Sequence, residues 1–230
     1  MLATQERGNV TGHVTRISSV SCCPQCGCED FFGERFARRS ADRYRTKGLG
    51  KVPRSLLDFL VPRGLAGRRV LEIGGGVGAL VTELVKAGAE GGTLVEVVPG
   101  YEPFARAIFD DAGVDVEFRL ADLVADPTGA DPADLVALNQ VVCCTPDGPA
   151  LVGSAAALTR VALAFTYPRE RPTFRVLAAL LNLMFRMRRR SFRIFVHSRA
   201  ALVGAAEARG LRLVHEGRGL AWATAGFERG

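Results

Sequence analysis

A glycine-rich turn after a short apolar run is the feature that most constrains how this chain can fold. Residues 70–78 read Val-Leu-Glu-Ile-Gly-Gly-Gly-Val-Gly. Such a pattern is typical of a buried strand that turns sharply into the next helix, here over residues 79–87. Glycine lacks a Cβ and adopts strained dihedrals, and the first N–H groups of a helix attract negative or polar groups. The stretch therefore predicts a site where the backbone closely approaches a ligand such as a nucleoside.

Acidic residues mark the ends of the next two predicted strands. Glu96 lies near the end of a strand predicted over residues 93–98, and Asp122 follows one predicted over residues 114–120. In a doubly wound sheet, an acid at the end of the second strand lies about where ribose hydroxyls bind. A continuous apolar run over residues 133–142 suits the buried central strand of a parallel sheet. We therefore expect an α/β fold with a nucleoside site at the carboxyl ends of its strands.

This combination resembles the class I S-adenosylmethionine-dependent methyltransferases. The resemblance implies S-adenosyl-L-methionine as cofactor and a doubly wound, mostly parallel seven-stranded sheet with an antiparallel last strand. It also implies cofactor-binding roles: Gly74, Gly76 and Gly78 contact the methionine part, Glu72 orients the turn and the amino group, Glu96 holds the ribose, Asp122 lies by the adenine, and Asn139 and Gln140 line the floor. An NAD(P)-dependent oxidoreductase is the enzymatic alternative, because Gly74, Gly76 and Ala79 loosely fit the G-x-G-x-x-G/A fingerprint.

Further segments are similar to the group around magnesium-protoporphyrin IX methyltransferase and its bacterial relatives. They lie at residues 30–32, 43–49, 141–147, 166–169 and 195–197. The chain departs from that group at Gln140, where Arg is usual, and at Thr145, where Tyr is usual. It also lacks the His that chloroplast-type enzymes carry near Cys143 or Cys144. The resemblance therefore implies a class of enzyme and leaves a porphyrin substrate in doubt.

The order of these segments predicts three parts of the chain. We expect a mobile, Cys-containing tail at residues 1–29, an N-terminal helical arm at 30–66 and the methyltransferase domain at 67–230, with a lid insertion at 168–195 after the fifth strand. The core of the insertion, residues 174–185, is apolar nearly all round, so it is either buried or a lid over an apolar ligand. Two strands over 211–216 and 220–227 are expected to close the sheet.

The acceptor is expected to be an apolar small molecule methylated at oxygen, with carbon left open. Enzymes of this fold that methylate nitrogen commonly carry an Asn/Asp-Pro-Pro-Tyr-type motif after the fourth strand, where this chain reads Cys-Cys-Thr-Pro-Asp at 143–147. Arg169, Arg171 and the arm residues 44–47 could neutralise a carboxylate. A phenol would need a base, and His197 is the candidate, with a structural hydrogen bond as the alternative reading. Tyr44 is the arm residue expected to touch the substrate.

Charge and hydropathy bear on the partners. The net charge of +6 comes from 27 Arg and three Lys, and the arginines crowd residues 35–54 and 186–193. These clusters are either solvated helix faces or contacts for an acidic ligand or surface. A module that binds nucleic acid is the non-enzymatic alternative, ranked below a small-molecule acceptor. No segment is apolar for long enough to cross a membrane, so we expect a cytoplasmic protein and leave a homo-oligomer open.

Four cysteines lie close together near the N-terminus, at positions 22, 23, 26 and 28. Cys23 and Cys26 have the C-x-x-C spacing of half a zinc site, but the rest of the sequence contains no second C-x-x-C or His pair to complete it. The adjacent pair Cys143 and Cys144 could complete a site only through the fold. We therefore expect reduced thiols and no metal.

Overall fold

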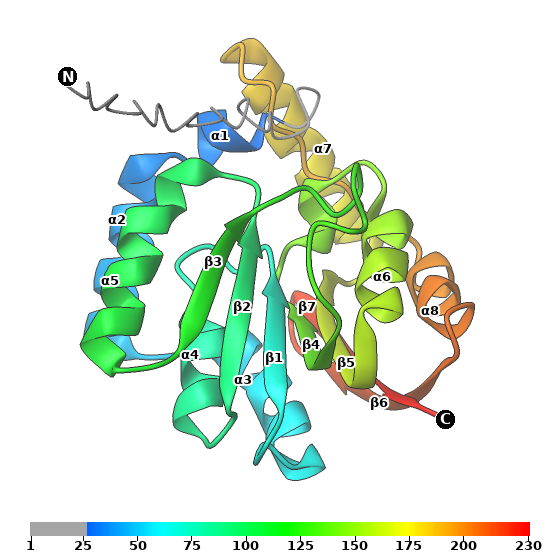
Figure 1. Ribbon diagram of the computed structural model, residues 1–230. Coiled ribbons are helices and arrows are strands. Elements are labelled where there is room, and N and C mark those ends of the chain that lie inside the picture. The colour runs from blue at the N-terminus through cyan, green and yellow to red at the C-terminus, as the bar shows by residue number, and fades with distance from the viewer. Residues whose placement is uncertain (1–26) are drawn as a thin grey trace, which may run out of the picture.

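A seven-stranded sheet organises residues 27–230, the part of the chain that the computed structural model describes (Figure 1). Its strand order is β3-β2-β1-β4-β5-β7-β6. The first five strands are parallel, and β7 is antiparallel to both of its neighbours, so that β6 runs with the first five. The strands are β1 (Arg69–Ile73), β2 (Gly91–Glu96), β3 (Val116–Leu120), β4 (Ala133–Leu138), β5 (Thr159–Pro168), β6 (Leu211–Arg218) and β7 (Trp222–Arg229). The predicted fold class is confirmed.

Both faces of the sheet are buried, and successive residues of its central strands are therefore apolar. Val70 faces one hydrophobic core, while Leu71 and Ile73 face the other. Successive side chains of a strand point to opposite faces, so a strand covered on both sides is apolar throughout. This is why residues 70–73 and 133–138 appear in the sequence as nearly continuous apolar runs.

Helices cover the two faces (Figure 1). One face packs against α3, α4 and α5, with α2 outside α5, and the other packs against α6 and α8. The helical elements are α1 (Cys28–Phe31), α2 (Glu34–Lys47), α3 (Lys51–Leu60), η1 (Val61–Arg63), α4 (Ala79–Lys86), η2 (Pro99–Tyr101), α5 (Glu102–Ala112), η3 (Val142–Cys144), α6 (Gly148–Ala157), α7 (Pro172–Met187) and α8 (Arg199–Glu207). None of the helices within residues 27–230 is long and apolar enough to span a membrane.

The N-terminal arm and the insertion meet at the carboxyl end of the sheet. Helix α7 follows β5 directly, and an aromatic cluster joins it to α1: the Phe31 ring stacks on Phe192 at 4.8 Å and contacts Phe185 edge-on at 5.4 Å. Phe31 thus packs against the insertion and against the core on this face of the sheet. Helix α1 begins at Cys28, so the boundary predicted at residue 30 lies inside it. Of the tail predicted at residues 1–29, residues 1–26 lie outside the described part of the chain.

The fourth strand is shorter than its apolar run predicts. It ends at Leu138, and Gln140 takes a positive φ of 56°. A residue other than glycine rarely adopts that conformation. At Gln140 the backbone leaves the strand direction and enters η3. The apolar residues 141–143 consequently line the end of the sheet instead of extending it.

Stacking of Phe227 on Phe165 gives a test of the core. Both rings are fully buried, with centroids 5.5 Å apart. Phe227→Ala should lower the free energy of unfolding by about 3–5 kcal/mol, because it leaves a cavity in the core between the sheet and helices α6 and α8. Leu220→Ala, at a side chain that is 90% exposed, should change it by less than about 0.5 kcal/mol. Urea denaturation measures both, and equal effects would contradict the packing described.

Candidate functional site

The glycine-rich turn between β1 and α4 can be built only from glycines at three positions. Gly74, Gly76 and Gly78 have φ angles of 66°, 61° and 71°. A Cβ on Gly74 would lie 2.3 Å from Val141 Cγ2, and one on Gly78 would lie 2.6 Å from Phe109 Cε1. Side chains are thus excluded both by conformation and by space. The turn lies at the carboxyl ends of the parallel strands, where open α/β sheets bind their ligands.

Glu72 supports this turn from beneath. Helix α4 has Gly78 at its N-cap, which offers no side-chain acceptor. Glu72 supplies one from strand β1, because its Oε2 accepts a hydrogen bond from the Val81 backbone N–H at 2.9 Å. The carboxyl group is buried, and burial raises its pKa to about 8, with the nearby charge of Glu96 adding to the shift and the Val81 N–H opposing it.

Glu96 ties the turn to the end of β2. Its Oε2 accepts from Gly76 N–H at 2.9 Å, and its Oε1 accepts from the N–H groups of Val97 and Val98 at 2.8 and 3.1 Å. Burial raises the pKa of this carboxyl group, and the three N–H donors oppose that rise. Unlike Glu72, Glu96 lines a cavity.

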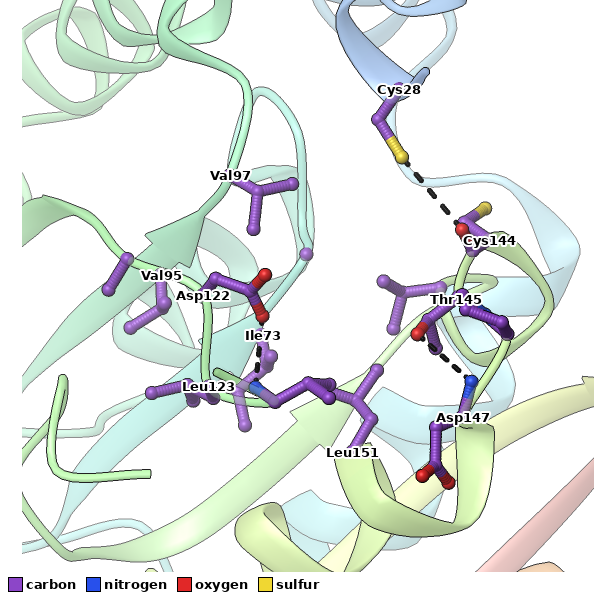
Figure 2. Close-up of a pocket in the computed structure, with 15 residues that line it drawn as sticks. Cys28, Ile73, Val95, Val97, Asp122, Leu123, Cys144, Thr145, Asp147 and Leu151 are labelled. Carbon is purple, nitrogen blue, oxygen red and sulfur yellow. Dashed lines mark hydrogen bonds between the residues drawn. The ribbon is translucent and has the colours of Figure 1, made fainter. Parts of the chain in front are cut away.

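Two adjoining hollows flank the turn. The first, of about 240 Å³, has mainly apolar walls from Ile73, Val95, Val97, Leu123 and Leu151. Figure 2 shows Val97 and Asp122 on one side of it and Cys144 and Thr145 on the other. Asp122 Oδ1 accepts from Val124 N–H at 3.0 Å, which fixes the carboxylate at the wall. A flat heterocycle with a polar edge suits this space.

The second hollow, of about 330 Å³, is more polar. Gly74, Gly75 and Gly76 form one wall with Glu96 and Tyr101. Five residues line both hollows, so the two adjoin: Cys28, Gly74, Val97, Val141 and Cys144. The part farther from the turn is lined by the arm residues Phe32, Phe36, Ser40 and Arg43.

Asn139 and Gln140 line this second hollow and are held by Thr166 of β5. The fully buried Thr166 hydroxyl accepts from Gln140 N–H at 2.8 Å and lies 3.5 Å from Asn139 Oδ1, to which it can donate. This contact stabilises the positive φ of Gln140, a strained conformation of the kind that clusters at functional sites. Thr166 belongs to the segment 166–169 that carries part of the resemblance, but a lone threonine in an apolar strand gives no signal of this contact.

Tyr101 and Arg43 are further residues that gain a place in the site only through the fold. A Cβ on Gly76 would lie 3.1 Å from Tyr101 Cε1, so the ring packs directly on the turn. Burial raises the pKa of the Tyr101 hydroxyl above its usual value, which keeps it neutral at physiological pH. Arg43 is the lining cation of the second hollow among the described residues.

Two residues predicted to act on the substrate lie elsewhere. Tyr44 follows Arg43 on α2 and points about a quarter-turn or more away, where its hydroxyl donates to Glu83 Oε1 at 2.6 Å. His197 packs on the far side of the 145–147 loop, where its Nε2 donates to the Thr145 carbonyl at 3.0 Å. Neither lines the two hollows. The geometry therefore gives Tyr44 a helix-packing contact and His197 a contact that holds the loop.

Arg169 and Arg171 also lie apart from the hollows. Arg169 Nη1 donates to the Gly219 carbonyl at 3.2 Å and lines a separate depression beside β6. Arg171 precedes α7 and is exposed. Neither arginine therefore lies where it could contact a molecule in the two hollows.

The described cysteines line or border the site. Cys28 Sγ lies 3.8 Å from the Cys144 carbonyl, and the Sγ atoms of Cys143 and Cys144 are 3.8 Å apart. Within residues 27–230, no group of three or more His, Cys, Asp or Glu side chains is arranged to hold a metal ion. Cys22, Cys23 and Cys26 lie outside the described residues, so the absence of zinc stays a prediction.

Comparison with known proteins gave a matching family model and solved structures of similar fold. The family model described as "Methyltransferase domain" matches residues 42–216. Magnesium protoporphyrin IX methyltransferase from Synechocystis PCC 6803, solved with bound S-adenosylhomocysteine (SAH), is 18% identical, with 88% of this chain and 98% of that chain covered and a TM-score of 0.68. The search of curated proteins gave no match.

Two larger proteins share the fold. An O-methyltransferase family protein from Burkholderia thailandensis is 20% identical, with 86% of this chain and 63% of that chain covered and a TM-score of 0.60. An O-methyltransferase family 2 protein from Planctomyces limnophilus DSM 3776, in complex with apigenin, is 19% identical, with 85% and 61% covered and a TM-score of 0.62. This chain thus spans less than two thirds of either.

Burial of Glu72 predicts a pH dependence of stability. Its carboxyl group has an ordinary pKa of 4.5 and a folded-state pKa of about 8, so between these values the folded chain keeps a proton that the unfolded chain releases. Stability from this group is present below pH 4.5 and is lost as pH rises toward 8, on the order of a few kcal/mol. Glu72→Gln should abolish that loss.

The measurement is urea denaturation of both proteins across this pH range. As pH rises, the free energy of unfolding of the wild type should fall relative to that of Glu72→Gln. The Glu90→Gln variant, changed at an exposed carboxyl group, should show the same pH dependence as the wild type. Parallel profiles for the wild type and Glu72→Gln would show that Glu72 ionises normally.

Proposed function

This chain belongs to the methyltransferase-domain family, and from that premise we propose that it transfers a methyl group from S-adenosyl-L-methionine to an oxygen atom of an apolar small molecule. The observation that carries the proposal is that the two hollows adjoin at the glycine-rich turn and share five lining residues. A cofactor lying along the turn would have its nucleoside in the apolar hollow and its reactive end at the entrance to the second.

Residues of this chain fit each part of that cofactor. The apolar walls formed by Val95, Val97 and Leu123 suit an adenine ring, and the Asp122 carboxylate can accept from an exocyclic amine. Glu96 faces the cavity where ribose hydroxyls would donate to its oxygens. The backbone of Gly74 and Gly76 can approach the methionine part because neither residue carries a Cβ. When bound, the cofactor supplies an electrophilic methyl group on a sulfonium.

Catalysis by this chain would rest on positioning. Displacement at a sulfonium methyl removes charge, so holding acceptor, methyl and sulfur in line within a partly dehydrated pocket accounts for much of the rate. The second hollow provides the wall for this through Tyr101, Asn139 and Gln140, while Phe32 and Phe36 from the arm exclude water. Helix α2, which carries Phe36 and Arg43, therefore forms the acceptor side.

The second hollow favours an acidic oxygen as acceptor. Arg43 could bind a carboxylate through charge-assisted hydrogen bonds, and a carboxylate is already a nucleophile that needs no base. No His or Lys is among the described residues that line this hollow. A phenol remains the second candidate, because two phenylalanines line the same space and a protein of the same fold was solved with apigenin.

A binding experiment tests the cofactor site. Glu96→Gln should weaken SAH binding by about 1.5–3 kcal/mol, roughly tenfold or more, because one of the two oxygens that can accept from the ribose and the backbone is replaced by an NH2 donor. Glu90→Gln, at an exposed acid before β2, should bind SAH like the wild type. Calorimetry measures both, with NADH as a comparison ligand. Unchanged SAH affinity in Glu96→Gln, or tighter binding of NADH, would exclude this assignment.

A turnover experiment tests the acceptor. In a methyl-transfer assay with labelled cofactor, a panel of porphyrins, phenols, aromatic acids and RNA should label a small acid or phenol and leave RNA unlabelled. For a carboxylate acceptor, Arg43→Gln should raise KM about tenfold or more with SAH affinity unchanged.

The matched control is Arg39→Gln, on the same helix but exposed and outside both hollows, which should leave KM unchanged. Turnover of a small anion should vary little between roughly 50 and 200 mM salt, whereas polyanion binding falls steeply over that range. Methyl transfer to RNA, with RNA binding that falls steeply as salt rises, would contradict the proposed small-molecule acceptor.

A further inference from the structure

Helix α7 exposes an apolar stripe to solvent. Val176, Leu180, Leu183 and Met187 are 60%, 59%, 54% and 76% exposed. Their spacing of four, three and four residues places them on one face of the helix. Five of the nine large apolar side chains exposed in the described part of the chain lie on α7. Such a concentration marks an interaction surface, because scattered single residues would be the ordinary case.

The opposite face of α7 fixes the helix in this orientation. Ala178 and Phe185 are buried, and Phe185 contacts the rings of Phe31 and Phe192. Asn182 donates to the Ile194 carbonyl and accepts from the Ile194 N–H, both at 2.8 Å. The apolar stripe is therefore the outward face of an anchored helix at the top of the molecule in Figure 1.

The segment that carries the stripe is strongly cationic. Residues 171–195 contain seven arginines and no acidic residue, although the whole chain has a net charge of only +6. Six of the seven arginines are exposed, and the described residues hold none of the seven in an ion pair: Arg171, Arg175, Arg186, Arg188, Arg189, Arg190 and Arg193. The rest of the chain is thus close to neutral.

We propose that α7 docks on the surface of an anionic lipid bilayer, with its apolar stripe in the acyl boundary and the flanking arginines on the headgroups. A helix that combines an apolar face with basic flanks and no acids is typical of such interfacial binding. Anionic lipid attracts clustered arginines over a distance set by the ionic strength. The helix lies on the surface in this arrangement and does not span the bilayer.

Charge argues against other occupants of the stripe. A second copy docked symmetrically through α7 would bring two sets of seven arginines together. Residues 1–26 hold one acidic residue, Glu6, against Arg7 and Arg16, so they do not complement the segment. RNA would use the arginines but would leave the aliphatic stripe exposed, since bases stack on aromatic and guanidinium planes.

Vesicle sedimentation of the full chain tests the proposal. The wild type should sediment with vesicles of phosphatidylcholine mixed with phosphatidylglycerol and much less with phosphatidylcholine alone. Replacing Val176, Leu180 and Leu183 together by Gln should lower the partition coefficient about tenfold or more. Leu220→Gln, at an equally apolar and 90% exposed site away from α7, should bind like the wild type.

The arginines are tested separately. Arg186→Gln with Arg188→Gln should weaken binding to anionic vesicles several-fold, whereas Arg160→Gln with Arg212→Gln, which removes the same charge from exposed sites elsewhere, should not. An equal loss in both pairs would show nonspecific electrostatic adsorption and would overturn the proposal. None of these positions lines the hollows, so SAH binding should be unchanged in every variant.

A fluorescent probe identifies the occupant. Trp222 is the single tryptophan, so Leu180→Trp in a Trp222→Phe background reports on the stripe alone. Its emission should be that of an exposed indole in buffer and should shift to the blue with anionic vesicles. Blue-shifted emission without lipid, or a dimer that the triple Gln variant dissociates, would assign the stripe to the chain itself or to a second copy and overturn the proposal.

Discussion

Two buried carboxylates hold the glycine-rich turn from opposite ends. Glu96 accepts from the N–H group of Gly76, and Glu72 accepts from that of Val81 in the first turn of α4. The turn, residues 74–78, has no polar side chain that could make such hydrogen bonds itself. Its positive φ angles are therefore maintained by hydrogen bonds from strands β1 and β2, and the cavities beside it have their shape because these two acids are in place.

Burying two carboxyl groups close together is electrostatically unfavourable. Both carboxyl groups are buried, and the charge of Glu96 adds to the rise in the pKa of Glu72. Glu96 accepts three N–H donors, whereas one is recorded for Glu72. The better-supplied group is the one at the cavity, and its three N–H donors oppose the rise that burial gives to the pKa of Glu96.

Sequence could predict the sheet because its signals are local. Apolar runs, glycines and the acid at the end of β2 lie within one or two elements, so the order of strands and the position of Glu96 follow from spacing. The acceptor side depends on which residues of distant helices face inward. Arg43 and Tyr44 are neighbours in sequence yet face different surroundings, and the His197 ring turns toward a carbonyl. Such orientations depend on tertiary packing, which periodicity in one segment does not encode.

Thr166 has a consequence for how this chain could be modified. Its hydroxyl holds Gln140, and the strand that carries it continues through Pro168 into α7, which begins at Pro172. The residue that holds the cavity-lining Gln140 and the first residue of α7 are thus six residues apart on one continuous segment. Replacing the insertion by that of a homologue would therefore also change the glycine-rich turn's cavity if it displaced Thr166. A junction placed after Thr166 that keeps the β5–β7 pairing through Pro168 and Trp222 would avoid this.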